Sequence, residues 1–185
     1  MNFEEFKKLS FEVNDINYKW KIFKQVFKKQ KNRTLLEKVD IYTFNVFQTA
    51  TFDMVILSIQ RLLDSSETSG HENLSINRQL KHIKKEDNDL YDNLIDKYEN
   101  IKEKTKKLKK HRNKRIGHND LKTKINEGRK LENINIKEMD QIIKEINDLF
   151  SKIANRFYKK PMIFGRNTSL PIGNNLIKTL RNIKK

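Results

Sequence analysis

Hydrophobic residues recur every three or four positions along most of the chain, which is the spacing that places them on one face of an α-helix. In the first segment these residues are Val13, Ile16, Trp20, Phe23 and Phe27. The alternation predicts one amphipathic helix with lysines on its outer face. We interpret its aromatic residues as core packing rather than as a surface on which bases stack.

The next helical pattern is the longest in the chain and covers about residues 34–64. Further apolar residues broaden its stripe, so we expect this to be the most buried helix. The stripe consists of Leu36, Val39, Thr43, Phe47, Ala50, Met54 and Leu57.

Three shorter patterns follow this helix. The polar stretch 65–73 predicts a loop, after which Ser75 is placed to cap a short helix over 76–83. A fourth helix is expected from 90 to 108, running straight into a basic segment, and a last one from 139 to 157. Because no convincing alternation of β-branched residues occurs, four to five main helices predict an all-α antiparallel bundle.

The chain length of 185 residues suits one domain. We expect a helical domain over residues 1–158 and a basic tail over 159–185. The stretch 161–173 contains both prolines and two glycines without helical periodicity. This part of the tail is therefore expected to be extended or mobile.

The composition also indicates a compartment. The chain has no cysteine, which excludes disulfides and thiolate-bound zinc and suits a reducing environment. Its start lacks the pattern of a secretory signal. The most apolar stretch, 52–59, is short and includes Asp53, whereas a membrane span needs about 20 apolar residues. We therefore expect a cytoplasmic protein with no membrane contact.

The net charge of +16 favours a polyanionic partner. A chain rich in Lys, Asn and Ile also fits an AT-rich genome, so the total charge leaves the question open. The placement is more informative, because residues 102–124 hold eleven bases against two acids and residues 159–185 hold seven bases and no acid. Two local patches are harder to explain by genome composition than a uniform excess, so they strengthen the case for a polyanionic partner.

Most familiar catalytic machinery is missing from the sequence. The four histidines are His71, His82, His111 and His118, and no pair has the spacing of a zinc site. The glycines are scattered, so no phosphate-binding loop is present, and no GxSxG elbow occurs. We expect neither a metal nor a cofactor.

What remains is the basic run 109–120. Its plainest interpretation is a solvated helix end, where bases favour the helix dipole. RNA cleavage without a metal, however, needs a group that moves protons and a group that stabilises the phosphorane, and His and Arg supply these functions. One Arg and one His give only part of this set, and a dimer would supply the rest.

The run resembles a known family at this point. Arg112 followed by Asn113, with His118 a few residues later, is similar to the signature of HEPN domains. The phrase RNKRIGHND at 112–120, together with SIQRLLD at 58–64 and ENLSINRQL at 72–80, resembles the abortive-infection AbiU-type branch. The resemblance covers roughly residues 15–157.

The resemblance implies a helical bundle that acts as a metal-independent endoribonuclease and dimerises with its Arg-His motifs facing each other. Arg112 would stabilise the phosphate, His118 would be the general acid or base, and Asn113 would position one of them. Asp64 is a further candidate, either for orienting the site or for a structural salt bridge near Arg61. The remaining supporting residues are Arg115 and Asp120, and the candidate RNA-binding residues are Lys109, Lys110 and Lys114.

The spacing within the motif leaves alternatives open. On an unbroken α-helix two positions six apart lie about 120° apart around the axis, so Arg112 and His118 would not share a face, whereas Arg115 and His118 would. Either Gly117 ends the helix, or the two residues converge only with the partner subunit, or Arg115 is the working arginine. We favour the first two, because the family motif begins at the Arg before Asn.

The resulting functional hypothesis is a ribonuclease effector of a phage-defence or toxin-antitoxin system, working as a homodimer with an antitoxin or another defence partner. The alternative is a HEPN-type module that binds RNA or nucleotides without cleaving. HEPN toxins paired with a nucleotidyltransferase often carry a Tyr shortly after the His, but Asn119, Asp120 and Leu121 follow here. That kind of partner is therefore not supported. A helical scaffold or a DNA-binding protein fits less well, since no recognition helix is evident.

Overall fold

The structure is a computed structural model that describes residues 2–117, 120–121, 130–158, 164 and 171–183. Helices dominate these residues, which confirms the all-α prediction. The elements are α1 (Phe3–Phe27), α2 (Gln30–Leu62), β1 (Glu67–Thr68), β2 (His71–Glu72), α3 (Ile76–Glu86), α4 (Asn88–Lys104), α5 (Lys106–His111), the π-helix η1 (Arg112–Ile116), α7 (Ile136–Phe157) and α8 (Ile172–Ile183).

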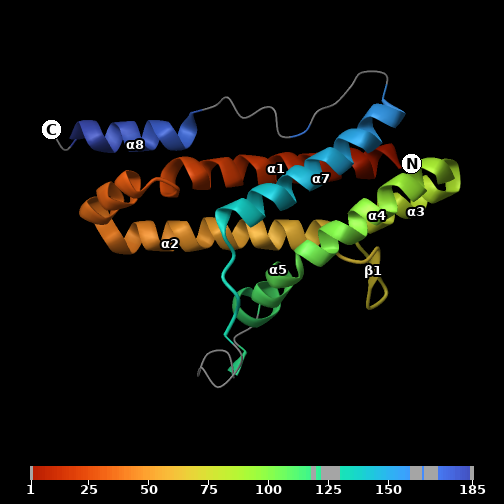
Figure 1. The fold of residues 1–185 in the computed structure, drawn as a ribbon, viewed down its shortest axis with the longest axis horizontal. Coiled ribbons are helices and arrows are strands. Elements are labelled where there is room, and N and C mark those ends of the chain that lie inside the picture. Colours follow the sequence, from red (N-terminus) through yellow and green to blue (C-terminus); the bar gives the residue numbers. More distant parts are fainter. Residues whose placement is uncertain (1, 118–119, 122–129, 159–163, 165–170, 184–185) are drawn as a thin grey trace.

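Helices α1 and α2 form a long antiparallel hairpin on which the other helices pack (Figure 1). Helix α7 lies against α1 and α4, and α3 packs on α4. Helices α5 and η1 leave this layer and descend beside α2, at the bottom of the view. Helix α8 runs along α1 at the other end of the hairpin.

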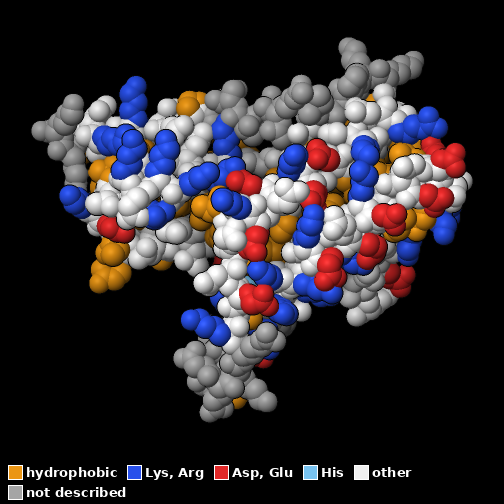
Figure 2. All heavy atoms as spheres, in the orientation of Figure 1, with side chains coloured by type: hydrophobic (Ala, Val, Ile, Leu, Met, Phe, Trp, Pro, Cys, Tyr) orange, Lys and Arg blue, Asp and Glu red, His pale blue; other side chains and the backbone are white. Residues whose placement is uncertain are grey.

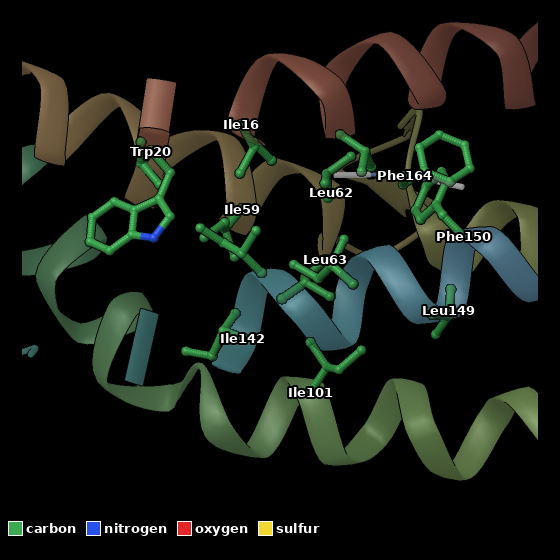
Figure 3. Packing of buried hydrophobic residues seen from close by; sticks show 14 of the residues in the cluster. Ile16, Trp20, Ile59, Leu62, Leu63, Ile101, Ile142, Leu149, Phe150 and Phe164 are labelled. Atoms are coloured by element: carbon green, nitrogen blue, oxygen red, sulfur yellow. The ribbon is translucent and has the colours of Figure 1, made fainter. Parts of the chain in front are cut away.

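The main core lies where α4 and α7 meet the hairpin (Figure 3). Ile59 of α2 and Leu63, which follows this helix, point toward Ile142 of α7 and Ile101 of α4, and all four side chains are buried. The predicted stripe of α1 faces the same interior, and each of its five residues is buried as expected. Removal of these apolar side chains from water is the main source of stability.

Helix α2 differs from the expectation that it is the most buried helix. Its predicted inner stripe is exposed at Val39, Phe47 and Met54, and a continuous buried face begins only at Val55. The reason is that α4 and α7 cover only the second half of the hairpin, whereas in the first half α2 contacts α1 and α8 and leaves its remaining side exposed.

Helix α2 is also interrupted at Asp40, whose backbone is extended (φ −165°, ψ 100°). The Asp40 carboxylate accepts hydrogen bonds from the backbone N–H groups of Tyr42 and Thr43, so it caps the second part of the helix. The apolar stripe therefore continues on a helical segment with its own N-terminal cap.

The predicted loop at 65–73 contains a small hairpin, in which Ser69 and Gly70 both have positive φ and turn β1 back onto β2. Ser75 then caps α3 as predicted, since its side chain accepts from the N–H of Arg78.

The extent predicted for the fourth helix is wrong at its C-terminal end. It does not run straight into the basic segment, because Thr105 separates α4 from α5.

The segment expected as a tail contains a helix that the sequence analysis did not predict. In α8, the backbone N–H of Gly173 donates to Gln25 Oε1 at 2.9 Å, Ile177 is buried, and Arg181 donates to Asn32 Oδ1 at 2.8 Å. The expectation of an extended chain at 161–173 falls largely outside the described residues. Within the described ranges, no helix is long and apolar enough to cross a membrane.

Candidate functional site

The motif lies at the end of a short helical arm formed by α5 and η1. The turn η1 is π-helical, so a backbone N–H bonds the carbonyl five residues earlier and not four as in an α-helix. The N–H of Gly117 donates to the carbonyl of Arg112 at 2.7 Å. Such π-helical turns are frequent at functional sites. Gly117 ends the helix, as the first alternative in the sequence analysis required. His118 and Asn119 lie outside the described residues.

Gly117 approaches the backbone of Arg112 closely. Its own φ of −83° is open to any residue, but a Cβ at this position would lie 3.1 Å from the Arg112 carbonyl oxygen. The position therefore favours glycine because of this contact.

Arg112 contacts Asp64, which follows the end of α2. The guanidinium Nη1 donates to Asp64 Oδ1 at 3.0 Å, and the two side chains are 34% and 30% exposed. The salt bridge that the sequence suggested near Arg61 is thus formed with Arg112, while Arg61 lies 3.8 Å from Glu12. A partly exposed guanidinium with one bond to an acid retains N–H donors for a ligand.

Arg115 has a different environment. Its two terminal nitrogens donate to both carboxylate oxygens of Asp53 at 2.9 and 2.5 Å, which is the bidentate geometry of strong ion pairs. Its Nε donates to His111 Nδ1 at 3.2 Å. Because Nδ1 accepts this bond, the proton of a neutral His111 resides on Nε2, which donates to the carbonyl of Glu132 at 2.9 Å. Arg115 therefore fastens the arm to α2.

A cleft with a volume of about 530 Å³ opens beside Arg112. It is formed where the end of α2 meets α4 and the helical arm. Its lining includes Gln60, Asp64, Tyr98, Glu99, Lys109 and Arg112.

The structure brings some of the predicted residues together and separates others. Lys109 lines the cleft with Arg112 and Asp64. Lys110 lies 3.3 Å from Glu132, which precedes α7. Asn113 and Lys114 are exposed on η1. The backbone N–H of Asp120 donates to the carbonyl of Lys114 at 3.3 Å, so the chain after the motif returns onto η1.

The positive field of the arm is weaker than the sequence count suggests. Lys107 donates to Glu138 at 2.8 Å, and this bond is the largest cause that raises the pKa of Lys107. Lys102 and Lys106 pair with Glu99 and Glu103. Figure 2 shows acidic side chains interspersed among the basic ones over α4 and α7. Lys109 and Lys114 have no acid within ion-pair distance among the described residues.

Three residues of this region were missed by sequence reasoning. Asp53 and Gln60 stand in an apolar helical stretch, and each is a polar interruption at a position close to the buried face. That interruption was the available signal. Glu132 lies before α7, and nothing in its local sequence links it to the arm. Over the part of the chain that the structure describes, no group of three potential metal ligands gathers.

The helical bundle, the arm that carries Arg112-Asn113 and the polar cleft beside it agree with the resemblance to HEPN domains. A comparison with family models supports this assignment directly, because the model HEPN_AbiU2, described as AbiU2, matches residues 4–167. The chain belongs to the AbiU2 family of HEPN proteins, which is related to abortive infection. Searches of curated proteins and of solved structures returned no match.

Proposed function

We propose that this protein is a metal-independent endoribonuclease that acts as an effector in phage defence or in a toxin-antitoxin system, in the cytoplasm and with an antitoxin or another defence partner. The observation that carries the proposal is the position of Arg112. Its guanidinium is held by Asp64 at the rim of a polar cleft, and Arg112 precedes His118 by six residues in the sequence.

The proposed reaction is attack by a ribose 2′-oxygen on the adjacent phosphorus. The 2′-hydroxyl loses its proton to a base, the bond from phosphorus to the 5′-oxygen breaks, and that oxygen takes up a proton. The products are a 2′,3′-cyclic phosphate and a 5′-hydroxyl. Arg112 donates hydrogen bonds to the phosphate oxygens, where negative charge increases in the transition state. His118 transfers one of the protons and Asn113 positions one of the reacting groups.

A homodimer would complete this set, since one His cannot act as base and as acid at the same instant. The exposed face of α2 supports a dimer. It carries Val39, Tyr42, Val46, Phe47 and Met54, and its part after the break at Asp40, from Tyr42 to Met54, is about 18 Å long at 1.5 Å per residue. Exposed apolar surfaces of this kind mark interfaces.

The location of this face relates it to the arm. Met54 adjoins Asp53, to which Arg115 fastens the arm. A two-fold axis near this end of the face would therefore bring the arms of the two subunits close together. The same motif of each subunit would then face its counterpart in the other subunit.

The test is cleavage of a labelled single-stranded RNA in EDTA by wild type, Arg112→Ala and His118→Ala. We expect cleavage by wild type, with product ends as given above, and a loss of at least about 100-fold in each variant, as for removal of one donor to a charged transition state. The matched control is Arg156→Ala, which removes an exposed arginine paired with Asp87 on another surface. It is expected to cleave like wild type.

Two results would contradict the proposal. Cleavage of a substrate with a 2′-deoxy residue at the scissile position would show that water is the nucleophile. Binding of RNA without any cleavage, unaffected by EDTA or Mg²⁺, would favour the alternative of a non-catalytic RNA- or nucleotide-binding module.

A further inference from the structure

Gln60 carries an unsatisfied hydrogen-bond donor beside the candidate site. Its side chain lines the cleft, the residue is only 4% exposed, and its Nε2 has no hydrogen-bond partner among the described residues. A buried amide without a partner costs stability, so an isolated glutamine at this position is unfavourable unless a ligand uses it.

The cleft is polar without being strongly basic. Its lining contains four bases, Lys102, Lys106, Lys109 and Arg112, and three acids, Asp64, Glu99 and Glu103. A groove for a phosphate chain would carry a clear excess of bases. The near balance of charge suits a neutral group with several donors and acceptors.

Tyr98 lines the cleft as a structural residue and not as a reactive group. Its ring is buried and its hydroxyl donates to the carbonyl of Leu63 at 3.4 Å. Burial raises the pKa of Tyr98 to about 12, so the phenol remains protonated. Lys102 Nζ lies 5.1 Å from the centre of this ring and is held there, since it also pairs with Glu99.

Gln60 lies in the last turn of α2 and Asp64 follows the end of this helix, and both residues line the cleft. One presents a donor and the other a carboxylate, next to the guanidinium of Arg112. Proteins that read single-stranded RNA bind the edges of unstacked bases with such side chains. The volume of about 530 Å³ is within the range of small-molecule sites.

We propose that this cleft binds one nucleobase of the RNA next to the scissile phosphate, and that Gln60 Nε2 donates a hydrogen bond to an acceptor atom of that base. The position of the base relative to the scissile bond rests on the proposed ribonuclease function. The binding of a base through Gln60 does not.

The first experiment measures binding by calorimetry, with the full chain and the four nucleoside 5′-monophosphates as probes. Ribose 5-phosphate, which lacks the base, is the reference. Wild type is expected to bind at least one nucleotide more tightly than ribose 5-phosphate. Gln60→Met, which keeps the shape and removes the donor, is expected to lower the affinity for that nucleotide about 5- to 10-fold, as for one hydrogen bond. Its affinity for ribose 5-phosphate is expected to be unchanged.

Two controls separate this role from a structural one. Gln48→Met changes a glutamine on the same helix that does not line the cleft, and it is expected to bind like wild type. Thermal unfolding of unliganded Gln60→Met is expected at the wild-type temperature or above it, because the substitution removes an unpaired buried amide. Gln60→Glu provides a second variant of the same shape in case Gln60→Met does not fold.

The second experiment maps the cut sites of wild type and Gln60→Met in an RNA of random sequence. We expect a base preference next to the cut in wild type and its loss in the variant. Unchanged nucleotide affinity and unchanged preference would overturn the inference, because a water molecule would then satisfy Gln60, and the proposed ribonuclease would stand. Nucleotide binding that depends on Gln60 in a protein that never cleaves RNA would support the inference and refute the ribonuclease.

Discussion

Arg115 and Asp53 form a two-hydrogen-bond ion pair that fastens η1 to the middle of α2. Arg112, three residues earlier, contacts Asp64 through one bond and borders the cleft. The two arginines of the motif therefore have different surroundings, and different consequences are expected when each is removed.

Arg115→Ala is expected to lower the free energy of unfolding by about 1–3 kcal/mol, because it leaves the poorly exposed Asp53 carboxylate without its partner. Arg112→Ala is expected to stay within about 1 kcal/mol of wild type, as is usual for partly exposed positions outside a buried network. Urea denaturation measures both changes. If Arg112→Ala destabilised the protein more, Arg112 would be the structural arginine and its proposed role in catalysis would fail.

Lys109→Ala is expected to weaken RNA binding and to reduce the salt dependence of the affinity by about one unit of slope, as for one lost phosphate contact. Lys110→Ala serves as the matched control, since Lys110 already pairs with Glu132 and lies away from the cleft. Fluorescence anisotropy with a short RNA at several salt concentrations measures both. An equal loss of RNA affinity in the two variants would show that the RNA contacts both sides of the arm and not only the side that faces the cleft.

Gly117→Ala is expected to reduce cleavage at least about tenfold, since small displacements of catalytic groups have large effects on rate. The added Cβ would press on the Arg112 carbonyl and shift the guanidinium that this residue carries. The unfolding temperature is expected to change little, because the site is exposed. A variant with normal activity would indicate that the end of η1 adapts freely.

Replacing Tyr42 and Phe47 with arginine is expected to give a folded monomer that no longer cleaves RNA, because charges would be buried in the proposed interface. Sedimentation velocity gives the oligomeric state and circular dichroism the helix content. Phe11→Arg is the control, since Phe11 is also exposed but lies on α1. A wild-type protein that cleaves RNA as a monomer would refute the shared site.

Glu5 joins α1 to α3 and gives a pH-dependent contribution to stability. The hydrogen bond from Arg78 at 2.9 Å is the largest cause that lowers the pKa of Glu5, against the opposing effect of burial. Because the folded-state pKa is below the usual value near 4.5, this contribution is complete above that value and disappears as the pH falls through the folded-state pKa.

Glu5→Gln is accordingly expected to unfold at a lower temperature than wild type at pH 7, and the difference is expected to shrink as the pH falls below about 4.5. Thermal unfolding across this range measures it. His82 Nε2 lies 3.6 Å from Glu5 Oε2, so the same comparison in the His82→Gln background is the control for this second contact. A constant difference at all pH values would show that the carboxylate charge is not involved.

The sequence predicted the helices well where burial and periodicity agree, as in α1 and α7. The expected buried face of α2 was wrong because an apolar stripe indicates only that the stripe is covered. It does not indicate whether another part of the same chain or a second chain covers it. The break at Thr105 was invisible for a related reason, since the apolar spacing continues to Leu108. Arg112 was identified by resemblance, but its partner Asp64 is 48 positions away, and such a pairing depends on how α2 and η1 meet.

Helix α8 has a consequence for the order in which the molecule assembles. Its contact between Gly173 and Gln25 spans 148 positions, and a Cβ at Gly173 would come within 2.8 Å of the Gln25 side chain. During synthesis the α1–α2 hairpin can close long before α8 leaves the ribosome, so α8 docks onto a surface that is already formed. Until then the face of α1 that α8 covers is exposed to solvent, and a glycine at position 173 lets α8 approach that face closely when it docks.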